Sequence, residues 1–272
     1  MSTVASPRYR DMTFGVTRVS MRDGKDGVRY MQADQPLAPH AARMTDRLLH
    51  WARAAPDRTF MARRLRNADG STGDWQPITY AQALAGARSI AQALLDRGLD
   101  AERPVVVLSE NDLEHALLAL GCMLAGVPYS PASPAYSTVS QDYDKLRHVL
   151  QTLTPGLVYA SDPARYGKAI AAAVGPDAEV VLGTGRIDRR GATPFADLLA
   201  TPATGSVDAA IAATGPDTIT KFLFTSGSTK LPKAVINTHG MWCANQQQMR
   251  QSMPVLAQEP PVLVDWLPWN HT

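Results

Sequence analysis

Apolar and polar positions follow a helical period over residues 79–98. Thr79 and Gln82 have the spacing of a capping box, and Gly98 follows the last apolar position. Between them, one helix face collects the apolar side chains Leu84, Ala87, Ala91, Leu94 and Leu95. The pattern predicts a helix. Residues 105–108 form a continuous apolar run, typical of a strand buried on both faces of a parallel sheet, and residues 111–125 return to helical spacing.

The same alternation of strand and helix continues to residue 199. Further strands are predicted at 157–160 and 179–182, and helices at 143–153, 163–174 and 194–199. Repeated βα units predict an α/β fold with parallel sheets flanked by helices. Residues 127–134 interrupt the pattern with three prolines, which exclude a helix and favour a short edge strand leading into a loop.

Three segments are expected from changes in this pattern. Residues 1–40 mix charge with glycine and proline without a sustained period, and we expect an N-terminal arm with at most short strands. Residues 41–217 form the predicted first α/β sub-domain, in which 201–217 reads as a connection. Residues 218–272 form the start of a second α/β sub-domain, with the following elements: strands 219–224, 234–237 and 262–265, and helix 241–251.

Composition narrows the class of protein. Hydrophobic residues make up 45% of the 272 residues and charged residues 19%, which indicates a globular protein. The net charge is +2 and the basic residues do not cluster, so a nucleic-acid partner is not expected. The apolar run 116–127 is too short to cross a bilayer, and the first thirty residues lack the apolar stretch of a signal peptide. Cys122 and Cys243 are expected to be buried free thiols, which fits a reducing cytoplasm.

Residues 225–233 carry the candidate chemistry. This segment reads Thr-Ser-Gly-Ser-Thr-Lys-Leu-Pro-Lys. Its hydroxyls and backbone N–H groups can donate to phosphate oxygens, Gly227 allows close backbone approach, and a lysine adds positive charge. A polar hairpin turn is the alternative. The segment is not a Walker A loop, because Leu231 and Pro232 stand where Gly-Lys is required.

Two other site types are not supported by the spacing of residues. Gly183 and Gly185 begin a dinucleotide fingerprint, but Asp188 occupies the place of the third glycine. No metal site is predicted, because the six histidines lack the spacing and cysteine partners of zinc ligands: His40, His50, His115, His148, His239 and His271. Most of these are expected at the surface or at helix ends, and His239 is expected to begin the following helix.

Residues 224–229, which read Phe-Thr-Ser-Gly-Ser-Thr, and the following Pro232-Lys233 resemble the phosphate-binding signature of the adenylate-forming superfamily. Residues 125–129 (Ala-Gly-Val-Pro-Tyr) and the proline-rich turn after them resemble the first α/β sub-domain of that fold. Residues 267–271 (Leu-Pro-Trp-Asn-His) resemble its next motif, which borders the acyl and adenylate pocket. The resemblance covers about residues 41–272 and is greatest to the feruloyl-CoA synthase branch.

The resemblance implies an ATP-dependent acid–CoA ligase that uses ATP, Mg²⁺ and coenzyme A and activates a small-molecule carboxylic acid, of an aryl or hydroxycinnamic kind. It assigns phosphate binding to the loop residues Thr225, Ser226, Gly227, Ser228, Thr229 and Lys233. Lys233 and His271 are the implied catalytic residues, and Trp266, Trp269 and His271 the implied pocket wall.

Two departures from the family pattern stand out. Lys230 and Ala234 replace residues that are usually glycine in the family. Family members also continue past the position of Thr272, so the chain resembles an N-terminal portion, and we expect it not to form an acyl adenylate alone. Two alternatives stay open: a non-catalytic fragment that binds phosphate or docks a partner, and an acyl-AMP ligase that loads a carrier protein.

Overall fold

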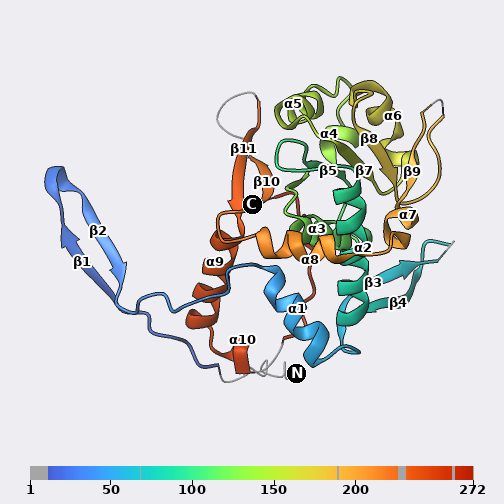
Figure 1. Cartoon of the computed structure of the whole chain (residues 1–272). Coiled ribbons are helices and arrows are strands. Elements are labelled where there is room, and N and C mark those ends of the chain that lie inside the picture. The colour runs from blue at the N-terminus through green and yellow to red at the C-terminus, as the bar shows by residue number, and fades with distance from the viewer. Residues whose placement is uncertain (1–11, 68, 189, 226–230, 259–260, 272) are drawn as a thin grey trace, which may run out of the picture. The chain divides into compact units, whose positions relative to one another are not determined.

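The computed structural model describes residues 12–67, 69–188, 190–225, 231–258 and 261–271. The chain divides into two compact units: residues 42–241 with 266–272, and residues 1–41 with 242–265. The first unit is built on a seven-stranded sheet (Figure 1). Within the described part of the chain, no helix combines the length and the apolar character needed to cross a membrane.

The seven-stranded sheet has the order β11-β10-β6-β5-β7-β8-β9. All neighbouring strands run parallel except β10 and β11, which form an antiparallel hairpin. The strands are β5 (Val105–Leu108), β6 (Tyr129–Pro131), β7 (Leu157–Ala160), β8 (Glu179–Leu182), β9 (Thr193–Pro194), β10 (Ile219–Thr225) and β11 (Lys233–Thr238). The predicted α/β fold with a mainly parallel sheet is confirmed.

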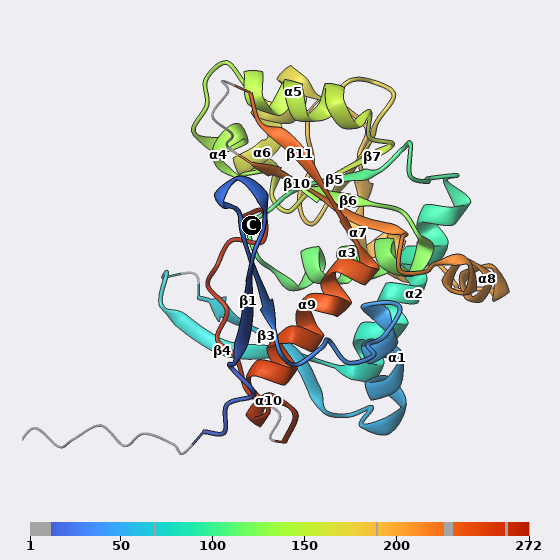
Figure 2. The same ribbon diagram turned by 90° about the vertical axis from the view of Figure 1, so that its left-hand side faces the viewer.

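Helices cover both faces of this sheet (Figure 2). One layer contains α4 (Ala135–Thr138), α5 (Asp144–Leu153) and α6 (Pro163–Ala173). The other layer contains α3 (Leu113–Ala125), with α2 (Tyr80–Asp96) and α8 (Gly205–Ala213) packed against it. The helices α1 (Thr45–Ala54) and α7 (Phe195–Ala200) contact α2. Because both faces are covered, the strands β5 and β7 are fully buried and consist mainly of apolar residues.

The start of α2 confirms the predicted capping box. The Gln82 amide donates to Thr79 Oγ1 at 3.2 Å, and the Thr79 amide donates to Gln82 Oε1 at 2.9 Å. After the helix, Gly98 adopts a left-handed φ of 63°, where a side chain would add strain. Both ends of α2 are therefore specified by local sequence.

The structure corrects the prediction for residues 127–134. β6 is not an edge strand, since it lies between β5 and β10. Prolines are tolerated there because the ladder uses carbonyls and amides of the neighbours: Val105 N donates to Pro128 O, and Ala132 N donates to Val107 O, both at 3.0 Å. Only one register pair, Lys221 with Tyr129, joins β6 to β10.

Residues 201–217 are also not a simple connection, because they contain α8. Thr204 caps this helix by accepting a hydrogen bond from the Ser206 amide, and Val207 and Ile211 are buried against α2 and α3. The unit also contains α1 and the antiparallel pair β3 (Thr59–Arg66) and β4 (Thr72–Thr79), for which the sequence pattern gives no prediction.

The second unit contains the arm and the chain from residue 242 to 265. The arm forms the hairpin β1 (Val19–Asp23) and β2 (Arg29–Ala33), joined by the 3-10 helix η1 (Lys25–Gly27), as expected for short strands. The helix α9 (His239–Ser252) begins at His239 as predicted, and α10 (Val255–Gln258) follows. Residues 262–265 are not a strand. Val262 in this run is 94% exposed. An apolar run becomes a strand only where another strand pairs with it.

Candidate functional site

The predicted phosphate loop connects the two strands of the β10–β11 hairpin. Thr225 at the end of β10 pairs with Lys233 at the start of β11, so the two ends of the loop lie side by side. Thr225 is half-buried and Lys233 is exposed. The predicted ligands Ser226, Gly227, Ser228 and Thr229, together with Lys230, lie outside the described residues.

The returning side of the loop is held by a histidine of α5. His148 Nε2 donates to the carbonyl oxygen of the buried Pro232 at 2.8 Å. The edge of its ring also packs on Phe224, with ring centroids 6.4 Å apart. Sequence reasoning grouped His148 with surface and helix-end histidines, because its partner is 84 residues away and leaves no local signal.

The second predicted segment, residues 267–271, is held against the same sheet. Asn111, in the connection between β5 and α3, donates to Leu267 O at 2.6 Å and accepts from the Trp269 amide at 2.9 Å. Lys221 of β10 donates from Nζ to Trp269 O at 2.7 Å. The His271 amide donates to Pro268 O, which closes a turn. Side chains from two distant parts of the chain therefore fix this segment.

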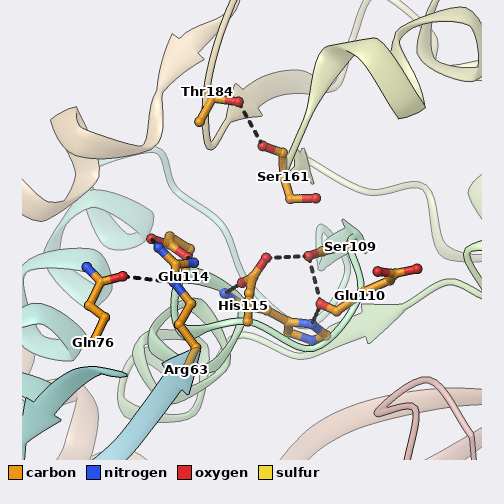
Figure 3. A network of polar contacts seen from close by, with 9 residues as sticks. Arg63, Gln76, Ser109, Glu110, Glu114, His115, Ser161 and Thr184 are labelled. Carbon is orange, nitrogen blue, oxygen red and sulfur yellow. Dashed lines mark hydrogen bonds and ion pairs between the residues drawn. The ribbon is translucent and has the colours of Figure 1, made fainter. Parts of the chain in front are cut away.

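The Trp269 ring packs on the edge of His115, with ring centroids 5.0 Å apart and planes at 73°. His115 is 1% exposed, and Nδ1 donates to Glu110 O at 3.2 Å (Figure 3). Burial lowers the pKa of His115 to about 4, with a smaller contribution from the nearby positive charge of Lys221. His115 is therefore neutral at pH 7 and presents an uncharged ring to Trp269.

A polar network at the carboxyl end of β5 fixes the start of α3, from which His115 extends (Figure 3). Asp112 caps the helix by accepting from the His115 amide at 2.6 Å, and Ser109 Oγ donates to the Asp112 carboxylate at 2.8 Å. Burial raises the pKa of Asp112 above its usual value. In the first turn of the helix, Glu114 forms a two-pronged ion pair with Arg63 of β3.

The predicted pocket residues differ in environment. Trp269 is half-buried against His115, whereas Trp266 is 79% exposed and His271 is exposed. Sequence reasoning did not identify Lys221 or Asn111 as residues of this region. A charged residue inside the apolar run of β10 was the only available signal for Lys221, and Asn111 offered none.

The described residues contain no cluster of three or more His, Cys, Asp or Glu side chains that could hold a metal ion. Cys122 and Cys243 are both buried thiols, as predicted. Burial raises the pKa of the Cys122 thiol, which makes it a poor nucleophile.

Comparison with known proteins finds a match to the family described as "AMP-binding enzyme", extending over residues 48–272. The chain belongs to this family. Among its relatives is the phosphinothricin tripeptide synthetase PhsB of Streptomyces viridochromogenes, 27% identical over 86% of this chain and 18% of that protein. Another is bacitracin synthase 3 of Bacillus licheniformis, 26% identical over 61% of this chain and 2% of that protein. The chain thus spans less than a fifth of these relatives.

Two solved structures share the fold of this chain. A fatty acyl-adenylate ligase structure, from a study of the enzymes of E. coli and L. pneumophila, matches 86% of this chain and 39% of that chain, with a TM-score of 0.59 at 21% identity. The structure of VinN matches 78% of this chain and 47% of that chain, with a TM-score of 0.55 at 22% identity. The mostly parallel sheet flanked by helices is therefore a fold that this chain shares with these two solved structures.

Proposed function

We propose that the protein activates a carboxylic acid with ATP and transfers the resulting acyl group to the thiol of coenzyme A. Membership of the AMP-binding family supports the adenylation step. The observation that carries the proposal is the pairing of Thr225 with Lys233, which places a segment of three hydroxyl residues and a glycine between two strand ends. Such a segment suits a triphosphate, because backbone and hydroxyl donors converge on phosphate oxygens.

In the proposed reaction, a carboxylate oxygen of the acid attacks the α-phosphorus of ATP in line, and pyrophosphate leaves with its bonding electron pair. The product is an acyl adenylate, a mixed anhydride whose carbonyl carbon is then attacked by the thiolate of coenzyme A, so that AMP leaves. Negative charge builds up on the transferred phosphate and on the leaving pyrophosphate. Catalysis is therefore mainly positioning and electrostatic stabilisation. Mg²⁺ is proposed to enter with ATP.

Individual residues have proposed roles in this reaction. Thr225, Ser226, Ser228 and Thr229 are the proposed hydrogen-bond donors, Gly227 allows the backbone to approach, and Lys233 is the proposed cation. His148 supports the loop from α5 through the Pro232 carbonyl, so it acts on the loop and not on the phosphate itself.

An aryl or hydroxycinnamic acid, such as ferulate, is the proposed substrate. The proposal follows the sequence of residues 266–271, Trp-Leu-Pro-Trp-Asn-His, and gives Trp266, Trp269 and His271 the role of the pocket wall. Aromatic side chains suit a flat aromatic acid, because ring pairs add to the free energy gained from burying apolar area. The edge-on packing of Trp269 on His115 supplies a fixed ring at this position.

Acid-dependent exchange between ATP and labelled pyrophosphate tests the adenylation step in the complete gene product. Ferulate and related aryl acids should give the highest kcat/KM, and palmitate and amino acids the lowest. Exchange that is fastest with palmitate refutes the aryl proposal but keeps the adenylation proposal. No exchange with any acid of the panel refutes both.

A carrier-protein thiol is the second candidate acceptor, and the match to a tripeptide synthetase favours it. The adenylate and the leaving group are the same in both cases, so pyrophosphate exchange does not distinguish them. The acceptor is decided by adding coenzyme A, or a phosphopantetheinylated carrier protein, to the preformed adenylate. Release of AMP with coenzyme A supports the ligase, and release with the carrier protein alone refutes coenzyme A as acceptor.

A further inference from the structure

Lys221 is a buried lysine on β10, the second strand from one edge of the sheet. It lies on β10 between Thr220 and Phe222 and is 6% exposed. Lysine is seldom fully buried, because its ammonium loses hydration that the protein interior does not replace. Its Nζ lies 2.7 Å from Trp269 O and 5.6 Å from the centre of the Tyr129 ring. The ammonium therefore exchanges water for a carbonyl oxygen and the face of an aromatic ring.

Burial of this side chain opposes folding at neutral pH. Desolvation lowers the pKa of Lys221 to about 8, which means that the folded protein binds this proton less tightly than the unfolded chain does. An apolar side chain of similar volume would fill the same space without this cost. Stability alone therefore does not account for a lysine at this position.

The Lys221 ammonium contacts the segment Leu267–His271 through the Trp269 carbonyl. Asn111 contacts the same segment through Leu267 O and the Trp269 amide. The backbone of Trp269 is hydrogen-bonded at both its amide and its carbonyl, and its ring packs on His115. The segment is thus attached to β10 through Lys221, to the β5–α3 connection through Asn111 and to α3 through His115.

The same strand also leads to the phosphate loop. Lys221 precedes Thr225 by four positions on β10, a distance of roughly 13 Å at about 3.3 Å per residue. One strand thus carries the start of the phosphate loop at its end and the attachment of the Trp269 segment near its beginning. A shift of that segment changes its position relative to the loop.

We propose that Lys221 is a positioning residue, which fixes the segment Leu267–His271 through the Trp269 carbonyl and thereby sets the wall of the acid-binding site relative to the phosphate loop. This inference rests on the proposed function, in which that segment borders the acid. In this role Lys221 acts through the segment, because its Nζ donates to the backbone oxygen of Trp269.

The hold weakens when the ammonium loses its proton, because a hydrogen bond from a charged donor is about twice as strong as one from a neutral donor. Among the residues that the structure describes, titratable side chains of α3 and β6 face Lys221. His115 on α3 has a pKa of about 4, and burial raises the pKa of the Tyr129 phenol on β6 above its usual value. Cys122, near Tyr129, is also buried with a raised thiol pKa. Among these groups, Lys221 is the one that changes charge near pH 8.

The test compares Lys221→Met with Lys168→Met in the complete gene product. Methionine keeps the unbranched apolar stem and removes the ammonium, and Lys168 is an exposed lysine of α6, on the other face of the sheet. Hydrogen exchange measured by mass spectrometry reports on residues 266–271 directly. We expect exchange in Lys221→Met to be at least about fivefold faster there, without a fall in melting temperature, and unchanged in Lys168→Met.

Kinetics provide the second readout. Lys221→Met should raise the KM for the acid at least about fivefold and leave the KM for ATP within about twofold, because only the acid wall moves. Asn111→Ala removes the hydrogen bonds to Leu267 O and from the Trp269 amide. It should also give faster exchange at residues 266–271 and a higher KM for the acid, whether or not Lys221→Met folds. Unchanged exchange at residues 266–271 in Asn111→Ala and in folded Lys221→Met overturns the inference. Faster exchange throughout the chain, with a lower melting temperature, also overturns it.

The outcome is separable from that of the proposed function. If the wild-type protein activates no acid, the proposed function fails, and hydrogen exchange still decides whether Lys221 holds the segment. If the wild type activates an acid and the variants exchange like the wild type, the proposed function stands and the role of Lys221 is refuted.

Discussion

Replacing Lys221 by methionine should change how the stability of the protein depends on pH. In the folded chain the ammonium is buried beside Tyr129 and the Trp269 carbonyl, and its pKa falls from 10.5 to about 8 because of desolvation. A difference of this size between the folded and unfolded states corresponds to about 3 kcal/mol of stability.

The sign follows from proton binding in the two states. Below about pH 8, Lys221 is protonated in both states, and burial of its charge lowers the free energy of unfolding by a constant amount. Between about pH 8 and 10.5 the unfolded state binds more protons than the folded state, so the contribution of Lys221 to stability rises with pH. Methionine has no such dependence.

At pH 7 the two proteins should have similar stability. Removing the buried charge stabilises the fold, whereas losing the hydrogen bond to Trp269 O costs about 1.5–3 kcal/mol, as for other hydrogen bonds from charged groups. As pH rises to about 10.5 the first effect disappears. The free energy of unfolding of Lys221→Met should then fall relative to the wild type by up to about 3 kcal/mol.

Urea denaturation followed by circular dichroism, at intervals from about pH 7 to about pH 10.5, measures this difference. Groups that titrate in both proteins cancel when the two free energies are subtracted, and Lys168→Met controls for the loss of an exposed lysine charge. A difference between Lys221→Met and the wild type that stays constant within about 0.5 kcal/mol over this range refutes the burial of a protonatable amine at this position.

Three further predictions concern packing and the phosphate loop. Gly121→Ala should destabilise the protein by about 1–3 kcal/mol in urea denaturation, because a Cβ there would lie 2.5 Å from a side chain of α2. Gly167→Ala, where the added Cβ would have no atom closer than 3.9 Å, should stabilise the protein by up to about 1 kcal/mol. Equal effects of the two substitutions would contradict this prediction. Lys233→Ala should lower kcat/KM for acyl-adenylate formation at least about tenfold, and Lys145→Ala, at an exposed position of α5, less than about twofold. His148→Ala should raise the KM for ATP several-fold through loss of the contact with the loop, and an unchanged KM would exclude this role.

The elements predicted from sequence are those that local pattern determines. The capping box of Thr79 and Gln82 and the buried strand 105–108 occur as expected, because their signals lie within a few residues. Position within the sheet was not predictable in this way. The prolines around β6 suggested an edge, and the structure places this strand inside the sheet, because the neighbouring carbonyls and amides complete the ladder.

The predictions for residues 201–217 and 262–265 were also wrong because contacts with distant parts of the chain determine these segments. The cap at Thr204 is a local signal, but the helix after it is stabilised by burying Val207 and Ile211 against α2 and α3, which sequence pattern does not show. The apolar run 262–265 has strand propensity and forms no strand. Strand propensity shows that a segment can form a strand, and the presence of a neighbouring strand determines whether it does.

The candidate site divides in the same way. The motif in residues 225–233 located the hairpin whose ends the structure brings together at Thr225 and Lys233, because the residue types themselves carry the signal. Asn111 could not be found from sequence, since its partners Leu267 and Trp269 are 156 and 158 residues away. Roles that consist of holding another segment appear only in the folded chain.

The burial of Lys221 follows partly from sequence, because side chains along β10 alternate between the two faces of the sheet. Phe222 and Phe224 pack with the core of α5 and α6, so Lys221 and Leu223 must face the opposite side of the sheet. Because that side is covered by α3, a lysine there is buried unless the strand is at an edge, and β11 covers the edge of β10. A single charge on a doubly covered strand thus requires a partner within the protein. Here the partner is a backbone oxygen, which a search for paired charges in the sequence would not have found.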